Sequence, residues 1–250
     1  NLGNISKLLV SDPKADPNHP LAANKQSFTA AQKARARGWS EVMFSSYGDV
    51  IKLMESQLND MLRGEGAKVA VSPAWSDKDR PETMVGRAPA SFGGLGATAL
   101  TEADIQKIGD CWYPVHAFGY NWLKSNGDEA KALAPKIDKL IQTYSENGFN
   151  CPGVILVTHS MGGILARALI HPDYGNIKDK VLGIVHGVMP TTGAAAAYKR
   201  MRAGFEGGKN FWDVKDNIIQ SVLGDSAVEV TAVLANAQGG LGLLPAAAGG

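Results

Sequence analysis

The residues around Ser160 are the part of the chain whose types and spacing best suit chemistry. An apolar run over residues 154–157 leads to this serine, glycines follow at residues 162–163, and residues 164–170 are typical of a helix. A buried strand, a sharp turn that exposes a serine hydroxyl, and a helix whose first amides face it form a nucleophile elbow. The sequence therefore predicts Ser160 as a nucleophile and the backbone N–H of Met161 as one oxyanion donor.

The motif departs from its usual form at one position. A glycine normally stands two residues before the serine, and this chain has Thr158, a compact β-branched residue suited to the end of a strand. A Ser-x-Gly string can also arise by chance in a chain with 29 glycines. Because strand, turn and helix occur in the order that the motif requires, the catalytic interpretation is favoured.

A serine nucleophile also needs a histidine base, an orienting carboxylate and a second oxyanion donor. His171 lies eleven residues beyond Ser160, about 16 Å along the helix, which excludes it as the base. His186 stands near the end of the next apolar segment, where a packing role is favoured over a catalytic one. Three candidate acids lie in segments typical of helices and are assigned to no site: Asp213, Asp216 and Asp225.

The elements that must position the serine follow a regular alternation. Apolar segments over residues 113–118, 154–159 and 181–188 are typical of strands, and an apolar stripe over residues 133–144 predicts a helix between the first two. This alternation predicts a mostly parallel sheet flanked by helices. Ligands bind at the carboxyl ends of such strands, which is where Ser160 falls. We expect one α/β domain over residues 1–250.

The first hundred residues carry weaker signals. We expect a short helix over residues 29–37 and a second helix capped by Asp49, whose apolar stripe would pack into a core. Residues 67–98 are rich in glycine, proline and charge, which predicts a long excursion over the surface. A plain loop is favoured there over a lid formed by residues 92–96. Asp225 is expected to cap a helix near the carboxyl end.

The elbow resembles that of the α/β-hydrolase superfamily, and within it the lipases related to lecithin–cholesterol acyltransferase and to the glycosylphosphatidylinositol inositol-deacylase. Residues 112–122 resemble the strand and loop that precede the elbow in acyltransferase-like lipases, with Asn121 in place of the usual aspartate. Residues 181–193 resemble the following strand with its Pro-x-x-Gly ending, and residues 239–245 resemble a Leu-Leu-Pro segment. The run over residues 186–201 is similar to bacterial type VI secretion phospholipase effectors.

This resemblance implies an α/β-hydrolase fold and a serine hydrolase that cleaves lipid acyl esters through an acyl-enzyme on Ser160. An acyltransferase, an amidase and a catalytically silent binding module on the same fold remain open alternatives. The resemblance further implies contact with a membrane surface, delivery outside the producing cytoplasm, and an immunity or secretion partner for a bacterial effector. It also predicts that the acid, the histidine and the second oxyanion donor lie outside residues 1–250.

Composition narrows the range of partners. The chain has 25 basic and 24 acidic residues, so a nucleic-acid partner is not expected, and its basic clusters at residues 33–37 and 199–202 are expected to be solvated helix faces. We expect no metal or cofactor. No apolar run reaches the length of about 18 residues that spans a membrane, and no signal peptide is visible. Cys111 and Cys151 are expected to be free, because in the resembled fold a third strand separates the two strands that they precede.

Overall fold

The computed structural model describes residues 30–64, 69–77, 79, 83–94, 98–205 and 223–245. The chain divides into two compact units, Asn1–Gly119 and Tyr120–Gly250, and each is described by itself. The single domain over residues 1–250 therefore stays a prediction. Among the described residues, no helix is both long and apolar enough to cross a bilayer. Both cysteine thiols are free, as predicted.

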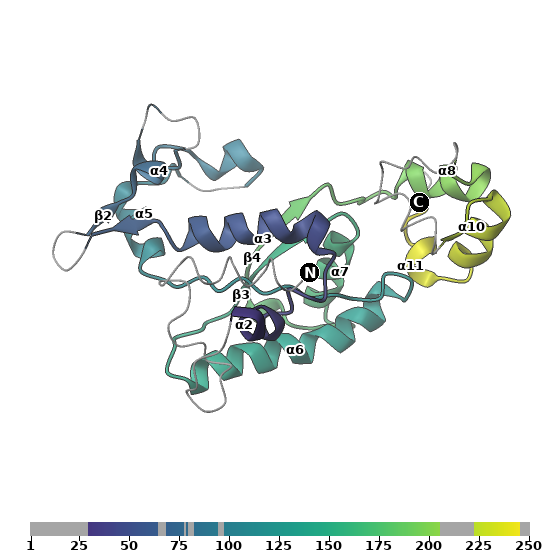
Figure 1. Cartoon of the computed structure of the whole chain (residues 1–250), viewed down its shortest axis with the longest axis horizontal. Helices are drawn as coiled ribbons and strands as arrows, with labels where there is room; N and C mark the ends of the chain where they lie inside the picture. The colour runs from purple at the N-terminus through teal and green to yellow at the C-terminus, as the bar shows by residue number, and fades with distance from the viewer. Residues whose placement is uncertain are drawn as a thin grey trace. The chain divides into compact units, whose positions relative to one another are not determined.

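The first unit is mainly helical (Figure 1). Its core forms around the buried Trp39, with Ala34 and Ile51. The elements, in chain order, are α2 (Ala30–Ala36), α3 (Phe44–Leu58), β1 (Leu62–Arg63), β2 (Ala70–Val71), α4 (Pro73–Ser76), η2 (Pro89–Phe92) and α5 (Glu102–Gly109). The described parts of the excursion over residues 67–98 thus contain short elements, and its role as a loop or a lid stays a prediction.

Helix α3 begins earlier than the sequence predicts. Asp49, expected as its N-cap, lies inside the helix with its side chain in solvent, and the N-cap is Met43, whose side chain makes no capping hydrogen bond. The cause is packing: Phe44 and Tyr47 lie against the Trp39 cluster, so the first turn is stabilised by the core. Tertiary contacts here outweigh the local capping preference.

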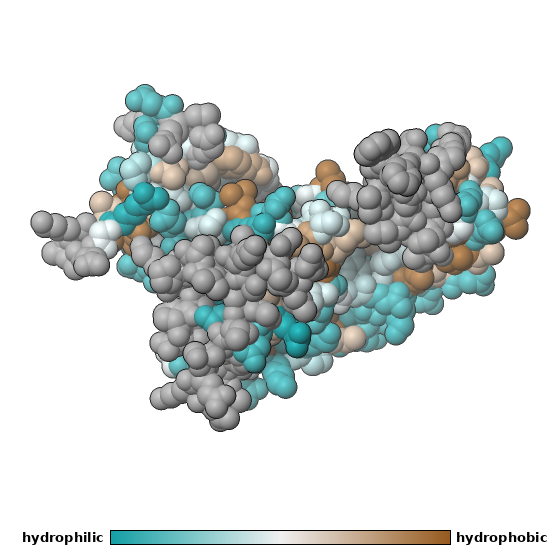
Figure 2. All heavy atoms as spheres, in the orientation of Figure 1, coloured by the Kyte–Doolittle hydropathy of each residue, from teal (hydrophilic) through white to brown (hydrophobic). Residues whose placement is uncertain are grey.

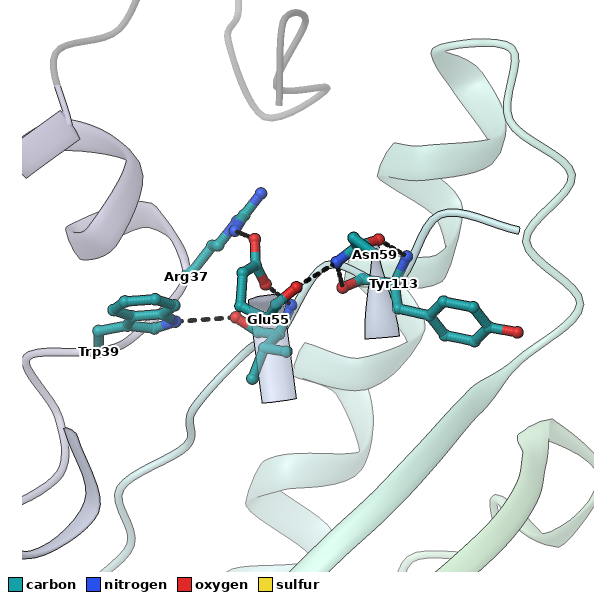
Figure 3. Close-up of polar contacts among 6 residues, drawn as sticks. Arg37, Trp39, Glu55, Asn59 and Tyr113 are labelled. Atoms are coloured by element: carbon teal, nitrogen blue, oxygen red, sulfur yellow. Dashed lines mark hydrogen bonds and ion pairs between the residues drawn. The ribbon is translucent and has the colours of Figure 1, made fainter. Parts of the chain in front are cut away.

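The segment predicted as a strand over residues 113–118 is not assigned as one. The side-chain amide of Asn59 accepts from Tyr113 N–H at 2.9 Å and donates to Tyr113 C=O at 3.0 Å, as a neighbouring strand would. Val115 N–H donates to Glu55 Oε2 at 2.8 Å, and Val115 C=O accepts from Trp39 Nε1 at 2.8 Å (Figure 3). Side chains of α3 and the turn after α2 therefore satisfy this extended backbone.

The second unit contains the predicted strand–helix–strand arrangement. Strand β3 (Val154–His159) and strand β4 (Val181–Gly187) are parallel, with Leu156 opposite Ile184 and Thr158 opposite His186. Helix α7 (Gly162–Ile170) connects them and packs against both strands, and helix α6 (Asn126–Glu146) packs on α7 (Figure 1). The remaining elements are η3 (Lys178–Lys180), α8 (Ala195–Ala203), α10 (Ala227–Leu234) and α11 (Gln238–Leu241).

Helix α6 follows its sequence signals closely. The Ser125 hydroxyl accepts from Gly127 N–H at its start, where acidic Asp128 and Glu129 also suit the positive end of the helix dipole. Leu133 and Ile137 lie on its buried face. Figure 2 shows its outer surface as predominantly hydrophilic, as expected for an amphipathic helix that covers α7.

The cap of α10 differs by one residue from the prediction. Ser226, rather than Asp225, is the N-cap, and its hydroxyl accepts from Glu229 N–H. The Glu229 carboxylate accepts in return from the N–H groups of Ser226 and Asp225, which completes a capping box. A serine three residues before a glutamate forms this reciprocal pair better than an aspartate four residues before it.

Candidate active site

Ser160 occupies a sharp turn between the end of β3 and the start of α7. Its φ of 52° lies in the left-handed region, which few non-glycine residues adopt. Its N–H donates to Gly187 C=O of β4 at 2.8 Å, and its C=O accepts from Gly163 N–H at 2.9 Å. This strand–turn–helix geometry is the arrangement that a nucleophile elbow requires.

Backbone strain also occurs just after β4, next to the Gly187 carbonyl that accepts from Ser160 N–H. Val188 follows Gly187 with a φ of 48°, although it is β-branched, and its side chain is 77% exposed. Left-handed conformations of such residues cost about 1–3 kcal/mol each and persist only where the surroundings enforce them. The end of β4 is therefore held against the serine turn at an energetic cost, as is common at functional sites.

The Met161 amide is placed to bind an anion. Met161 is the N-cap of α7, and among the described residues its N–H donates to no other group. The amides of a first helical turn carry a partial positive charge. Its side chain is buried, and a Cβ on Gly239 would lie 2.8 Å from Met161 Cε, so α11 packs directly against it.

The loop before α6 lies beside the same turn. The Asn121 side-chain oxygen accepts from Leu123 N–H at 3.1 Å, and Leu123 C=O accepts from Gly239 N–H at 3.2 Å. Asn121, which replaces the usual aspartate, thus shapes a turn that α11 fixes in place. Tyr120 lies at the start of this loop, and its hydroxyl is 4.0 Å from the position that a Cβ on Gly162 would occupy.

The two carboxyl-terminal segments singled out in the sequence also meet. Ala194 N–H, just after the Pro-x-x-Gly ending, donates to Leu243 C=O at 2.7 Å. Gly193 has a φ of 95°, and a Cβ there would lie 2.5 Å from Leu244 C=O and from Pro245 Cα. The Leu-Leu-Pro segment therefore closes over the loop that follows β4.

Comparison with known proteins agrees with this geometry. Residues 123–240 match the sequence model of the family described as "PGAP1-like alpha/beta domain". This part of the chain is therefore similar to PGAP1-like alpha/beta domains. This confirms the α/β-hydrolase fold with parallel strands and the predicted likeness to inositol-deacylase-like lipases.

One solved structure extends the likeness beyond residues 123–240. A chain in the crystal structure of the Tle4–Tli4 complex is 35% identical, with a TM-score of 0.67 over 86% of this chain. The alignment covers 39% of that chain, so the protein described here spans less than half of its length. No curated protein sequence is significantly similar to the chain.

Neither of the two histidines that follow Ser160 is hydrogen-bonded to its hydroxyl. His171 is the C-cap of α7, at the opposite end of the helix, in agreement with its exclusion. His186 Nδ1 lies 2.9 Å from Thr158 Oγ1, which is also 3.3 Å from Val185 C=O. The Thr158 hydroxyl thus lies between the imidazole and the Val185 carbonyl, which places the His186 ring against the two strands.

No acid or metal site emerges within the described part of the chain. No side chain there is hydrogen-bonded to the Ser160 hydroxyl, and Asp225 takes part in the capping of α10. Asp213 and Asp216 lie outside the described residues. No described group of three or more histidine, cysteine, aspartate or glutamate residues could hold a metal ion.

Tyr120 is a neighbour of the elbow for which the sequence predicts no role. A signal for it exists, since residues 112–122 resemble a strand and loop that precede the elbow. The carboxyl ends of parallel strands share one edge of a sheet, so a residue in that loop falls near Ser160.

Proposed function

We propose that this chain carries the nucleophile of a serine hydrolase that cleaves lipid acyl esters. The strongest support is the left-handed backbone conformation of Ser160 between β3 and α7. The N–H of the next residue, Met161, donates to no described group. The PGAP1-like family match and the resemblance to acyltransferase-like lipases support a lipid ester as the substrate class.

In the proposed reaction, Ser160 Oγ attacks the ester carbonyl carbon while a general base takes the hydroxyl proton. The carbonyl π electrons move to the oxygen, and the Met161 N–H donates a hydrogen bond to this oxyanion. The intermediate collapses and expels the alcohol, which receives the proton from the base. Water then attacks the acyl-enzyme by the same steps and releases the fatty acid. The base and its carboxylate are assigned to no described residue.

We favour a phospholipid as the substrate and delivery outside the producing cytoplasm as the setting. Two observations support this: the resemblance of residues 186–201 to type VI phospholipase effectors, and the match to a chain of the Tle4–Tli4 complex. A complex of that kind also supports a dedicated protein partner for this protein. Contact with a membrane surface follows from the substrate class.

The test is fatty-acid release from vesicles of phosphatidylethanolamine and phosphatidylglycerol by the full-length protein. Ser160→Ala is expected to lower kcat by about 10⁴-fold or more, because the nucleophile is lost. Ser145→Ala is the matched control, since the hydroxyl of this exposed α6 serine donates to Ile141 C=O of its own helix. Release that Ser160→Ala leaves unchanged would contradict the proposal.

The same assay separates the alternatives. Acyl transfer predicts that an added alcohol acceptor captures most of the acyl group in place of water. An amidase predicts turnover of the matching amide at a rate comparable to that of the ester. A silent binding module predicts no Ser160-dependent turnover of any of these substrates by the full-length protein.

A further inference from the structure

The elbow supplies one oxyanion donor, and an acyl-transfer site requires at least two to stabilise the tetrahedral intermediate. A candidate for the second donor lies in the loop before α6, where the Tyr120 hydroxyl is 4.0 Å from the Cβ position of Gly162. Cα–Cβ bonds in a helix tilt toward its N-terminus. The hydroxyl therefore lies close to the first turn of α7, the end of the helix where the Met161 amide is located.

Two independent contacts hold this loop at the elbow. Asn121 N–H donates to the Glu129 carboxylate at 3.2 Å, which ties the loop to the first turn of α6. Gly239 lies so close to Trp122 that a Cβ there would be 2.0 Å from Trp122 C=O, and the same Cβ would touch Met161 Cε. Loop, α11 and elbow are thus in mutual contact, so packing fixes the loop that carries Tyr120 next to the first turn of α7.

We propose that Tyr120 is a catalytic residue whose hydroxyl donates the second hydrogen bond to the oxyanion formed on attack by Ser160. This inference rests on the proposed function. A phenol is a suitable donor, because it stays protonated at neutral pH and carries a polarised O–H group. Because its side chain is long, a tyrosine can place its hydroxyl next to the developing oxyanion. The hydroxyl then takes the place of a backbone amide from another loop.

Gly162 supports this assignment. A Cβ there would meet Thr158 Cβ at 3.7 Å and Tyr120 Oη at 4.0 Å, which are ordinary contact distances, so packing alone does not require glycine. Glycine at this position places no side chain between the first turn of α7 and the tyrosine hydroxyl. An oxyanion that accepts from both groups would lie between them.

The experiment compares Tyr120→Phe with the full-length wild-type protein on a phospholipid ester. Loss of one oxyanion donor is expected to lower kcat about 100-fold, with KM changed by less than about twofold. A trifluoromethyl ketone bearing an acyl chain adds a second readout, because its hemiketal oxygen occupies the same site. Its affinity is expected to fall by about the same factor as kcat, with the thermal unfolding midpoint unchanged.

Tyr174→Phe is the matched control. Tyr174 lies beyond the opposite end of α7, where its ring contacts His171 and Lys131, and phenylalanine keeps both contacts. This variant is expected to behave as the wild type in both measurements. An equal loss in both tyrosine variants would overturn the assignment.

Other outcomes are equally decisive. Tyr120→Phe with unchanged kcat and unchanged ketone affinity, in a protein whose turnover depends on Ser160, would overturn the role of Tyr120 alone. A raised KM with unchanged ketone affinity would assign Tyr120 to ground-state binding and contradict the proposal. Absence of Ser160-dependent turnover in the wild type would overturn both the proposed function and this inference.

Discussion

Gly162 and Gly163 are the first two residues of α7, but packing requires a glycine only at Gly163. A Cβ on Gly163 would lie 2.6 Å from Met189 Cγ and 2.9 Å from Met189 Cβ, where the loop after β4 packs on α7. At Gly162 the nearest atom would be 3.7 Å away. The structure therefore separates a glycine required by the fold from one whose absence of a side chain leaves space at the site.

We predict that Gly163→Ala is less stable than Gly162→Ala by about 1–3 kcal/mol, the usual cost of overpacking. Both substitutions gain similar helix propensity, so the difference isolates the contact with Met189. Urea unfolding of the two variants measures it. Equal free energies of unfolding would show that Met189 moves aside without cost.

At the scale of elements, a buried ion pair connects α2 and α3 to the extended segment that follows α5. Arg37, expected on a solvated helix face, is instead fully buried because it pairs with Glu55 Oε1, and its guanidinium lies 5.9 Å from the centre of the Trp112 ring. The second Glu55 oxygen accepts from Val115 N–H, as Figure 3 shows. One carboxylate thus neutralises a buried cation and satisfies the backbone of the extended segment.

Glu55→Gln is expected to destabilise the protein by about 3–5 kcal/mol, because it removes the negative charge opposite a buried cation. Asp49→Asn on the same helix is the control, since Asp49 is fully exposed and its pair with Lys52 contributes little. Chemical denaturation of both variants is the measurement. A Glu55→Gln variant as stable as the control would refute the role given to this carboxylate.

Tyr113, in the same segment, provides a prediction about pH. Burial, together with the nearby Cys111, raises the pKa of Tyr113 to about 12. Its hydroxyl donates to Ile108 C=O at 2.8 Å, a bond that tyrosinate cannot make. Because the folded-state pKa is raised, the contribution to stability is fully present below pH 10, the ordinary value, and is lost as the pH rises to about 12.

Ultraviolet titration of tyrosinate in the wild type and in Tyr113→Phe measures this shift. The titration step missing from the variant should have its midpoint near pH 12. A missing step near the ordinary pKa of tyrosine would show that the hydroxyl is solvated.

Elements with strong local signals were predictable from the sequence, and those shaped by distant contacts were not. The strand–turn–helix around Ser160 and the helix after Ser125 form as predicted. In both, the spacing of the apolar residues and the residues at the ends indicate the same element within a few positions. The start of α3 depends on packing of Phe44 around Trp39. Likewise, the extended segment near Val115 pairs with side chains some sixty residues away in sequence rather than with a strand.

The candidate site divides in the same way. The roles predicted for Ser160 and Met161 come from a contiguous motif, whereas Tyr120 is about forty residues distant and its place depends on Gly239. His186 illustrates the limit, because its register opposite Thr158 decides that its ring contacts the threonine hydroxyl. The residues around His186 alone do not predict which β3 residue lies opposite it.

At the scale of the whole molecule, the family match and the second unit nearly coincide. The match to the PGAP1-like alpha/beta family spans residues 123–240, within the unit Tyr120–Gly250 that contains β3, the elbow and β4. The likeness to the Tle4–Tli4 chain reaches 86% of this protein and therefore includes part of the first unit as well. The central claim is that the Ser160 hydroxyl in this elbow is a working nucleophile.

The most direct test is covalent labelling of the folded, full-length protein with a long-chain fluorophosphonate, followed by mass spectrometry of its peptides. Our account predicts one adduct, on Ser160, that is absent from Ser160→Ala and from protein unfolded before labelling. An unlabelled Ser160 in the folded protein, or an adduct on another serine that persists in Ser160→Ala, would contradict it.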